Sequence, residues 1–287
     1  MKAMLVMNPR SGKKQALTVR DIAERVAQDL GVALDLRTVE GPGHGTELAR
    51  EAVTGGSLRV ISVGGDGTNN AVAAGLLGTD TAMGVVAMGS GNGYARSLGL
   101  PLMPEAALRH ALTAPPKRMD VCHLNDLPFL GTAGIGFDAR VADRFDRSAR
   151  RGMLSYARII VQEILGAPPM RVVVKAERET TEEQVLMLVF CNTREFGNGA
   201  DISPSSRPDD GIAELRLVRK PALPHLLKAF FDVYTHRADG NRHIRNISTR
   251  EARVWQAGTL AHLDGEPMTI GHEVRFRLQR GALWVVA

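Results

Sequence analysis

Residues 64–68 read Gly-Gly-Asp-Gly-Thr, and these residue types at this spacing suit phosphate chemistry. Strand-forming residues precede them and a helical run follows from Asn70, so the segment predicts a strand–loop–helix junction. Glycines let a ligand lie against bare backbone N–H groups, and the positive end of a helix dipole attracts phosphate. Asp66 would repel a polyphosphate unless a divalent cation bridged the two. We therefore interpret the loop as a nucleotide–Mg²⁺ site; the alternative is a tight turn that only packs the helix on its strand.

Two further small polar loops follow predicted strands in the same part of the chain. Residues 3–7 form an apolar run that leads into residues 8–12, and residues 83–88 form another that leads into residues 89–92. Ligands of open α/β sheets bind outside the carboxyl ends of the strands. The sequence therefore predicts that all three loops face one crevice. Lys13 could balance phosphate charge there, although a lone lysine is more often simply solvated.

The elements that position these loops alternate between strand and helix over about the first 115 residues, which favours a parallel, doubly wound sheet. Pro115 and Pro116 mark a boundary, after which short strands follow one another, interrupted by helices over about 140–165 and 223–235. We expect a nucleotide-binding α/β domain over 1–118 and a β-rich, antiparallel, sandwich-like domain over 119–287. About 15 residues at the end of the chain could pack back on the first domain.

The composition is that of a globular protein, with 44% hydrophobic and 23% charged residues among 287. A net charge of +5 favours anionic partners, but the aromatic content of 5% argues against nucleic acid. The apolar runs are shorter than the ~18 residues of a membrane span. Cys122 and Cys191 lack metal or redox spacing, so we expect buried thiols. These features predict a cytoplasmic protein with at most peripheral membrane association.

Five motifs in this order resemble the diacylglycerol kinase catalytic family, which includes bacterial lipid kinases and is related to sphingosine kinases and NAD kinases. They cover nearly the whole chain and comprise residues 8–12, 64–68, 134–138, 208–211 and 263–267. Residues 64–68 alone would suit NAD kinases or phosphofructokinase-like sugar kinases equally. The resemblance implies a first domain of NAD kinase/phosphofructokinase-like fold and a lipid-substrate domain. It also implies an ATP- and Mg²⁺-dependent lipid kinase of phospholipid biosynthesis.

The resemblance also carries nucleotide contacts over to named positions of this chain. The glycines and Thr68 would supply backbone N–H groups and a hydroxyl to the phosphates, and Asp66 would take the catalytic Mg²⁺. Thr38 on its own would be an ordinary strand residue. The implied nucleotide-binding residues are Asn8, Ser11, Gly12, Lys13, Thr38, Gly64, Gly65, Asp66, Gly67, Thr68, Asn69, Asn70, Ser90 and Asn92.

Glu266 is the candidate for general base, because a lipid hydroxyl must lose its proton as it attacks the phosphoryl group. Without the resemblance, Glu266 would as readily belong to a hairpin tip. Asp264, two residues earlier, is expected to hold the turn or to assist the base. A separate structural Mg²⁺ is implied at Asp210, with the backbone carbonyls of Arg207 and Ile212 and several waters as its other ligands.

A basic helix face indicates either contact with an anionic membrane surface or a solvated charged face relieved by Asp143 and Asp146. It consists of Arg140, Arg144, Arg147 and Arg151, with Arg150 adjacent. A weaker second patch consists of His236, Arg237, Arg242, His243 and Arg245. Self-association into a homodimer stays open.

The lipid itself stays open for two reasons. Many bacterial members of the family have a GTxND pattern where this chain has Gly-Ser-Gly-Asn-Gly at 89–93, a form closer to sphingosine kinases. Many also have a glutamate where this chain has Ala71. Diacylglycerol, a sphingoid base and another glycerolipid are all compatible with the sequence. A kinase of a soluble substrate such as NAD and a non-catalytic nucleotide-binding protein are the rival interpretations.

Overall fold

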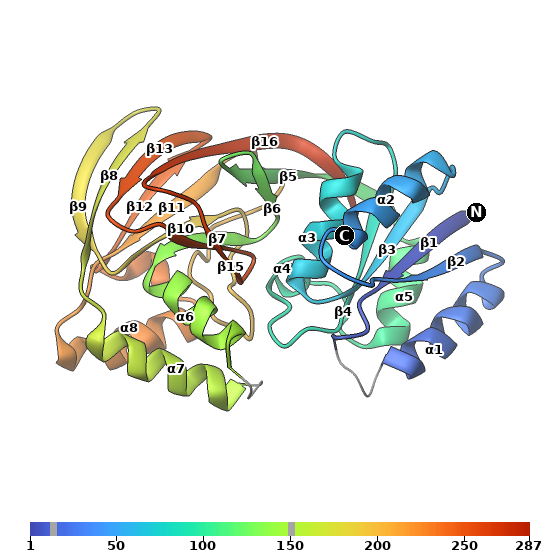
Figure 1. The fold of residues 1–287 in the computed structure, drawn as a ribbon, viewed down its shortest axis with the longest axis horizontal. Helices are drawn as coiled ribbons and strands as arrows, with labels where there is room; N and C mark the ends of the chain where they lie inside the picture. The colour runs from blue at the N-terminus through green and yellow to red at the C-terminus, as the bar shows by residue number, and fades with distance from the viewer. Residues whose placement is uncertain (12–15, 149–152) are drawn as a thin grey trace. The chain divides into compact units, whose positions relative to one another are not determined.

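The chain divides into two compact units in the computed structural model, which describes residues 1–11, 16–148 and 153–287 (Figure 1). Unit 1 comprises Met1–Asp120 and Arg280–Ala287, and unit 2 comprises Val121–Gln279. Two strands, β5 (Pro116–Leu124) and β16 (Glu273–Val286), have residues in both units. The predicted fold class, a doubly wound α/β domain followed by an antiparallel sandwich-like one, is confirmed.

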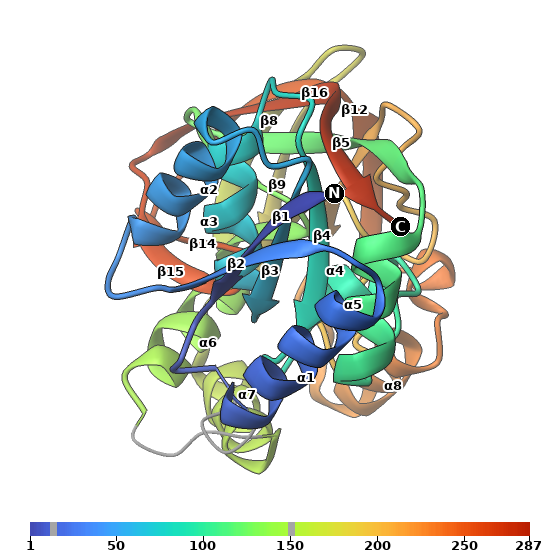
Figure 2. The same cartoon turned by 90° about the vertical axis from the view of Figure 1, so that its right-hand side faces the viewer.

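Unit 1 is built on a parallel sheet in the order β2–β1–β3–β4, and the end of β16 joins it where Val285 pairs with Met83. The inner strands are almost wholly apolar, as strands buried on both faces must be. Helices α2 and α3 cover one face and α1 and α5 the other (Figure 2). The elements are β1 Lys2–Met7, α1 Ala16–Asp29, β2 Ala33–Thr38, α2 His44–Thr54, β3 Arg59–Gly64, α3 Asp66–Leu76, β4 Ala82–Ala87, α4 Gly93–Ser97 and α5 Pro104–Thr113.

The helices of unit 1 are held by apolar stripes at helical spacing. Val19, Ala23 and Val26 of α1 are buried, and they pack with Leu108 of α5 into one core with Ile61 of β3. Because both faces of the sheet are covered in this way, its carboxyl edge is the place where loops remain accessible.

Unit 2 packs two antiparallel sheets around one apolar core, in which Phe190 stacks on Phe276 with ring centroids 5.3 Å apart. One sheet has the order β16–β13–β8–β9 with β5 and β6 beside β16, and the other has the order β12–β11–β10–β7–β14–β15. The strands are β6 Leu127–Phe129, β7 Thr132–Gly136, β8 Met170–Ala176, β9 Thr180–Val185, β10 Met187–Cys191, β11 Ala213–Val218, β12 Ile244–Thr249, β13 Glu251–Gln256, β14 Leu260–Leu263 and β15 Glu266–Thr269. The helices are α6 Phe137–Asp146, α7 Met153–Gly166, α8 Leu223–Tyr234 and the short 3₁₀ helix η1 Ala238–Gly240.

The single helix predicted over about 140–165 is wrong, because α6 and α7 are separate helices that pack on each other. Arg144 of α6 contacts Glu163 of α7, with Nη1 2.5 Å from Oε1. In a continuous helix these residues would lie about 28 Å apart at 1.5 Å per residue. Residues 149–152, which lie between the two helices, are outside the described residues. The second predicted helix is confirmed as α8.

Candidate functional site

Three loops meet at the carboxyl edge of the unit 1 sheet, as predicted, because β1, β3 and β4 are neighbours in it. The Asn8 N–H donates to the carbonyl oxygen of Val63 at 2.9 Å, and its side-chain amide donates to Thr68 Oγ1 at 3.2 Å. On the other side, the Met88 N–H donates to the Gly64 carbonyl oxygen at 2.7 Å. The residues that follow β1 and β4 are therefore both hydrogen-bonded to the end of β3, and Asn8 also contacts the first turn of α3.

Asp66 lies in the first turn of α3 and joins this helix to α4. One carboxylate oxygen accepts the Gly93 N–H at 3.0 Å, and the other accepts the Tyr94 N–H at 3.2 Å. The negative charge therefore lies at the N-terminus of α4, where a helix stabilises an anion.

Glycines at this edge allow the backbone of the loop after β4 to approach the backbone of the loop after β3. A Cβ on Gly89 would lie 2.7 Å from Gly65 Cα and 2.9 Å from Asn92 Oδ1, closer than real Cβ contacts come. Asn92 has a left-handed φ of 55°, and its side chain accepts the Gly89 N–H at 2.8 Å. The close approach of the two loops explains why small residues stand on both.

The remaining predicted nucleotide residues differ in exposure. Thr38 and Ser90 are exposed, and Thr38 ends β2 at the same edge of the sheet. Asn69 is only 1% exposed and accepts the Ser62 hydroxyl at 2.8 Å, so its side chain packs the junction, and its burial disfavours the predicted nucleotide contact. Ser11 donates its N–H to Asn8. Gly12 and Lys13 lie outside the described residues.

Glu266 begins β15 and follows a two-residue hairpin turn in unit 2. The central residues Asp264 and Gly265 both have positive φ, 48° and 85°, as a type I′ turn requires. Leu263 and Glu266 face each other across the hairpin, and Glu266 is exposed. The segment is thus a hairpin tip, as one of the two interpretations held, and Glu266 is an exposed residue of it. The role of Glu266 as general base stays a prediction.

Asp264 fixes this turn to the start of β7. Its carboxylate accepts three consecutive backbone N–H groups, from Leu130 at 2.9 Å, Gly131 at 2.8 Å and Thr132 at 3.1 Å. Charge-assisted bonds of this kind are the stronger class of hydrogen bond. The predicted turn-holding role of Asp264 is confirmed.

A buried pair beside the turn was missed by sequence reasoning. His262 of β14 is 3% exposed, its Nε2 lies 3.2 Å from Asp138 Oδ2, and its Nδ1 lies 3.3 Å from the Gly265 nitrogen. Gly134, which pairs with His262 across the sheet, leaves the room: a Cβ there would lie 1.8 Å from Asp138 Oδ2. Part of the signal was in the sequence, since Asp138 ends the motif at residues 134–138, which is rich in small residues. Its partner His262, however, is distant in sequence.

The loop before β11 carries the predicted structural metal residues. Asp210 accepts the Ile212 N–H at 3.0 Å, and Gly211 has a left-handed φ of 78°. Arg207, Asp210 and Ile212 are all exposed. Among the described residues no cluster of three or more His, Cys, Asp or Glu could hold a metal ion, so any cation here would rely on carbonyls and waters.

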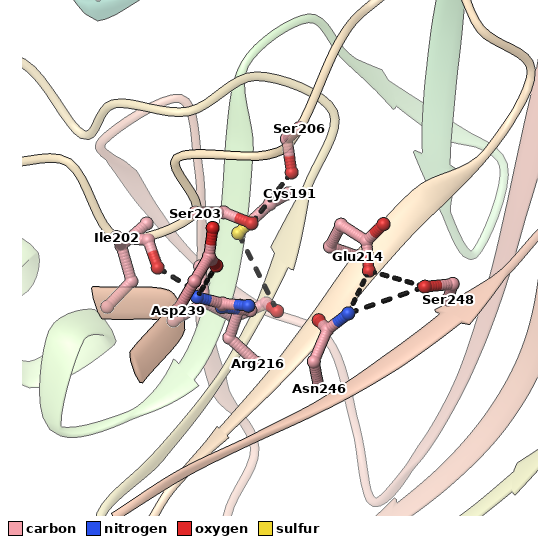
Figure 3. Close-up of polar contacts among 10 residues, drawn as sticks. Cys191, Ile202, Ser203, Ser206, Glu214, Arg216, Asp239, Asn246 and Ser248 are labelled. Atoms are coloured by element: carbon pink, nitrogen blue, oxygen red, sulfur yellow. Dashed lines mark hydrogen bonds and ion pairs between the residues drawn. The ribbon is translucent and has the colours of Figure 1, made fainter. Parts of the chain in front are cut away.

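A buried polar cluster supports the start of that loop (Figure 3). Arg216 is 2% exposed; its Nε donates to the Ile202 carbonyl oxygen at 3.1 Å, and its Nη2 contacts Asp239 Oδ1 at 2.5 Å. The Ser206 hydroxyl donates to Ser203 at 2.7 Å. Cys191 beside it is a buried free thiol, as predicted, and burial raises its pKa. Because a buried thiol of raised pKa is unreactive, Cys191 has a packing role rather than a chemical one.

The predicted basic helix face is paired with acids within unit 2. Arg140 and Arg144 both contact Glu163 of α7, and Arg147 contacts Asp143 one turn earlier. These pairs favour the alternative of an internally relieved charged face over a membrane-binding one. Arg150 and Arg151 lie outside the described residues.

A different surface of unit 2 combines cations with exposed aromatic rings. An open hollow of about 820 Å³ beside α8 and η1 is lined by Lys228, Phe231, Asp232, Thr235, Arg237 and Gly240. Phe231 is 61% exposed, and Tyr234, on the same helix, is 38% exposed. No helix within the described ranges is long and apolar enough to cross a membrane.

Comparison with known proteins accounts for both units. The diacylglycerol kinase catalytic domain family matches residues 2–124, and the YegS C-terminal NAD kinase beta sandwich-like domain family matches residues 131–287. A "probable lipid kinase YegS-like" of Chromohalobacter salexigens is 31% identical over 99% of this chain and 92% of its own. One of the same name from Enterobacter sp. is 27% identical over 98% and 94%. A diacylglycerol kinase crystal structure from Bacillus anthracis has the same fold, with a TM-score of 0.81 at 19% identity over 99% of this chain and 96% of that one.

Proposed function

Because the chain belongs to the family of YegS-like lipid kinases, we propose that it transfers the γ-phosphoryl group of ATP to the hydroxyl group of a lipid such as diacylglycerol or a sphingoid base. The family makes the chain an enzyme of the kinase class. The phosphoryl donor, the metal and the acceptor lipid belong to the proposal. The observation that carries it is the convergence of three small-residue loops at one sheet edge of unit 1.

Unit 1 would bind the nucleotide through this edge. Asp66 and Gly67, the first two residues of α3, can direct backbone N–H groups at phosphate oxygens, and the helix dipole adds to the attraction. Asn8 and Thr68 are already hydrogen-bonded to each other, which fixes two polar groups beside the phosphates. Catalysis of phosphoryl transfer is mostly positioning and charge stabilisation, and these groups supply positioning.

Mg²⁺ would be held at the same edge by the carboxylate of Asp66, which lies in the first turn of α3. When bound, the ion would neutralise charge that develops on the transferred phosphoryl group. A second, structural Mg²⁺ fits the exposed loop at Asp210 with the carbonyl oxygens of Arg207 and Ile212, because Mg²⁺ accepts one carboxylate and keeps several waters. Asp210 would then order the loop before β11.

Glu266 would act as the general base of unit 2. It is an exposed carboxylate at the start of β15, on a turn anchored through Asp264. A carboxylate so placed can accept the proton of the attacking lipid hydroxyl, typically accelerating a reaction by roughly 10²–10⁴-fold. The joint action of Glu266 and the nucleotide loops of unit 1 is part of the proposal.

The enzyme would meet its lipid at an anionic membrane surface through the α8 hollow. Arg237 is exposed and Phe231 is 61% exposed, whereas Lys228 is paired with Asp232 at 2.7 Å, so Arg237 supplies the main positive charge of this surface. Basic residues beside exposed aromatic rings are typical of interfacial binding.

This surface is tested with two variants in a vesicle sedimentation assay. Phe231→Ser should weaken sedimentation with phosphatidylglycerol vesicles, whereas Trp255→Ser, which changes another exposed aromatic residue of unit 2, should not. Equal binding by both variants would exclude this surface.

The test of the proposed reaction is a transfer assay with several acceptors. The protein is incubated with γ-labelled ATP and Mg²⁺ and with mixed micelles of diacylglycerol, sphingosine or monoacylglycerol, and in a separate arm with NAD. We expect label in an organic-extractable product, lost with EDTA and restored by Mg²⁺. Label in NADP with none in any lipid would instead support a kinase of a soluble substrate.

A further inference from the structure

We propose that His262 is a positioning residue for Glu266: its neutral ring, protonated at Nε2, holds the hairpin turn to the first turn of α6. The inference rests on the proposed function, in which Glu266 is the base. It concerns a residue that neither the motifs nor the family resemblance singled out.

The protonation of the ring follows from its two neighbours. The Gly265 backbone nitrogen, 3.3 Å from Nδ1, can only donate, so Nδ1 must be the unprotonated acceptor. The ring proton then lies on Nε2, which faces the Asp138 carboxylate at 3.2 Å and donates to it. Only this tautomer satisfies both contacts, and a doubly protonated ring would lose the bond to Gly265.

The surroundings of the ring leave it little freedom. The side chain of His262 is 4% exposed and that of Asp138 is 9% exposed. On the opposite strand, a Cβ at Gly134 would lie 2.8 Å from Nε2, and the Phe196 ring lies 6.2 Å away between centroids. The other oxygen of Asp138 accepts the Ala139 N–H at 2.9 Å, which fixes the carboxylate to the backbone of α6. The imidazole is therefore held at both ends in a closely packed position.

The turn is thus anchored on both of its central residues. Asp264 binds the three N–H groups at the start of β7, and the Gly265 N–H binds the His262 ring. Glu266 follows directly, so the direction of its side chain depends on both anchors. A displacement of about 1 Å at a catalytic group can cost roughly 10²-fold in rate, so the second anchor matters for turnover.

Two conservative variants separate the contacts of His262. In His262→Asn the side-chain oxygen can replace Nδ1 as acceptor for Gly265, whereas the reach to Asp138 is lost. In His262→Gln the amide can replace Nε2 as donor to Asp138, whereas the acceptor for Gly265 is lost. The pair is compared with the wild-type chain for kcat, KM for ATP and the free energy of unfolding.

We expect both His262→Gln and His262→Asn to lower kcat by roughly 10–100-fold with KM for ATP unchanged, because each variant breaks one of the two contacts through which the ring joins the turn to α6. Exchange of the Gly265 amide hydrogen should accelerate in His262→Gln and stay slow in His262→Asn. Equal kcat for His262→Gln and wild type, at equal stability, would overturn the positioning role while leaving the proposed function intact.

The ring state can be measured without turnover. The ¹⁵N signals of His262 in the labelled wild-type chain should show a protonated Nε2 and an unprotonated Nδ1. A proton on Nδ1 would overturn the inference. If the wild-type chain phosphorylates no lipid, the proposed function fails, and the ring state and the Gly265 exchange still decide whether His262 holds the turn.

Discussion

The loop at residues 64–68 in unit 1 and the turn at residues 263–266 in unit 2 are held in opposite ways. The loop is held largely by backbone bonds from the residues that follow the neighbouring strands β1 and β4, and its glycines leave space for another loop. The turn is held by side chains, with Asp264 and His262 contacting segments more than 120 residues earlier in the sequence. A loop that offers backbone N–H groups to a ligand must have small side chains. A turn that carries one functional carboxylate must instead be held in place by contacts with other segments.

The largest expected effect comes from filling the space beside the second anchor. In Gly134→Ala the new Cβ would lie 1.8 Å from Asp138 Oδ2 and 2.6 Å from its Cγ. Because the atoms around it are buried, we expect a loss of more than about 3 kcal/mol in unfolding free energy, and loss of turnover. Chemical denaturation measures the unfolding free energy, and the lipid transfer assay measures turnover. Gly258→Ala, where the nearest atom is 3.8 Å away, is the matched control and should unfold like wild type.

Removal of the first anchor should have the next largest effect. Asp264→Ala leaves the N–H groups of residues 130–132 without their acceptor, so we expect a cost of about 3 kcal/mol in stability. Turnover should fall further than stability alone explains, because Glu266 would lose its fixed direction. Denaturation curves and kcat are compared with those of Glu251→Ala, an exposed acid of the same unit. Unchanged stability in Asp264→Ala would contradict the anchoring described here.

In unit 1 the corresponding test adds bulk to the glycines. Gly89→Ala would bring a Cβ to 2.7 Å from Gly65 Cα, whereas Gly65→Ala would place its Cβ 3.4 Å from Gly89 Cα. We expect Gly89→Ala to lower the free energy of unfolding by about 1–3 kcal/mol, because the backbone of Gly65 cannot move aside as a flexible side chain can. Gly65→Ala should cost less, because 3.4 Å is close to an ordinary contact distance. Urea unfolding of the two single variants checks the order. The reverse order would show that the loops are not packed as described.

The smallest expected effect is the response of unit 2 to acid. Burial, with the nearby charge of Arg277, lowers the pKa of His123 in unit 2 from 6.5 to about 4. The unfolded chain therefore binds this proton at higher pH, so the stabilisation is complete above pH 6.5 and is lost as the pH falls toward 4. Between pH 7 and pH 5.5 the loss is about 1 kcal/mol.

The pH dependence of the unfolding free energy, measured for one variant and its control, tests this expectation. His123→Asn should flatten it over pH 7–5.5, whereas His225→Asn, which changes an exposed histidine, should leave it unchanged. A wild-type slope that persists in His123→Asn would assign the acid sensitivity to another group.

The meeting of three loops at the carboxyl edge of unit 1 could be predicted from the sequence because it depends on local patterns. Strand, glycine loop and helix follow one another at residues 60–77, and the parallel order of the strands places their carboxyl ends together. The role of Asp138 and His262 could not be predicted, because their contact joins residues 124 positions apart and depends on the register of β14 with β7. The break between α6 and α7 was missed for the same reason, since the ion pair of Arg144 and Glu163 is tertiary.

The central claim is that the exposed carboxylate of Glu266 removes the proton from a lipid hydroxyl while unit 1 holds the nucleotide. Its most direct test is the transfer of labelled phosphate into micellar lipid by wild type and by Glu266→Gln, with ATP binding measured in parallel. We expect Glu266→Gln to bind ATP like wild type and to lose turnover by roughly 10²-fold or more. Full transfer by Glu266→Gln would contradict the account.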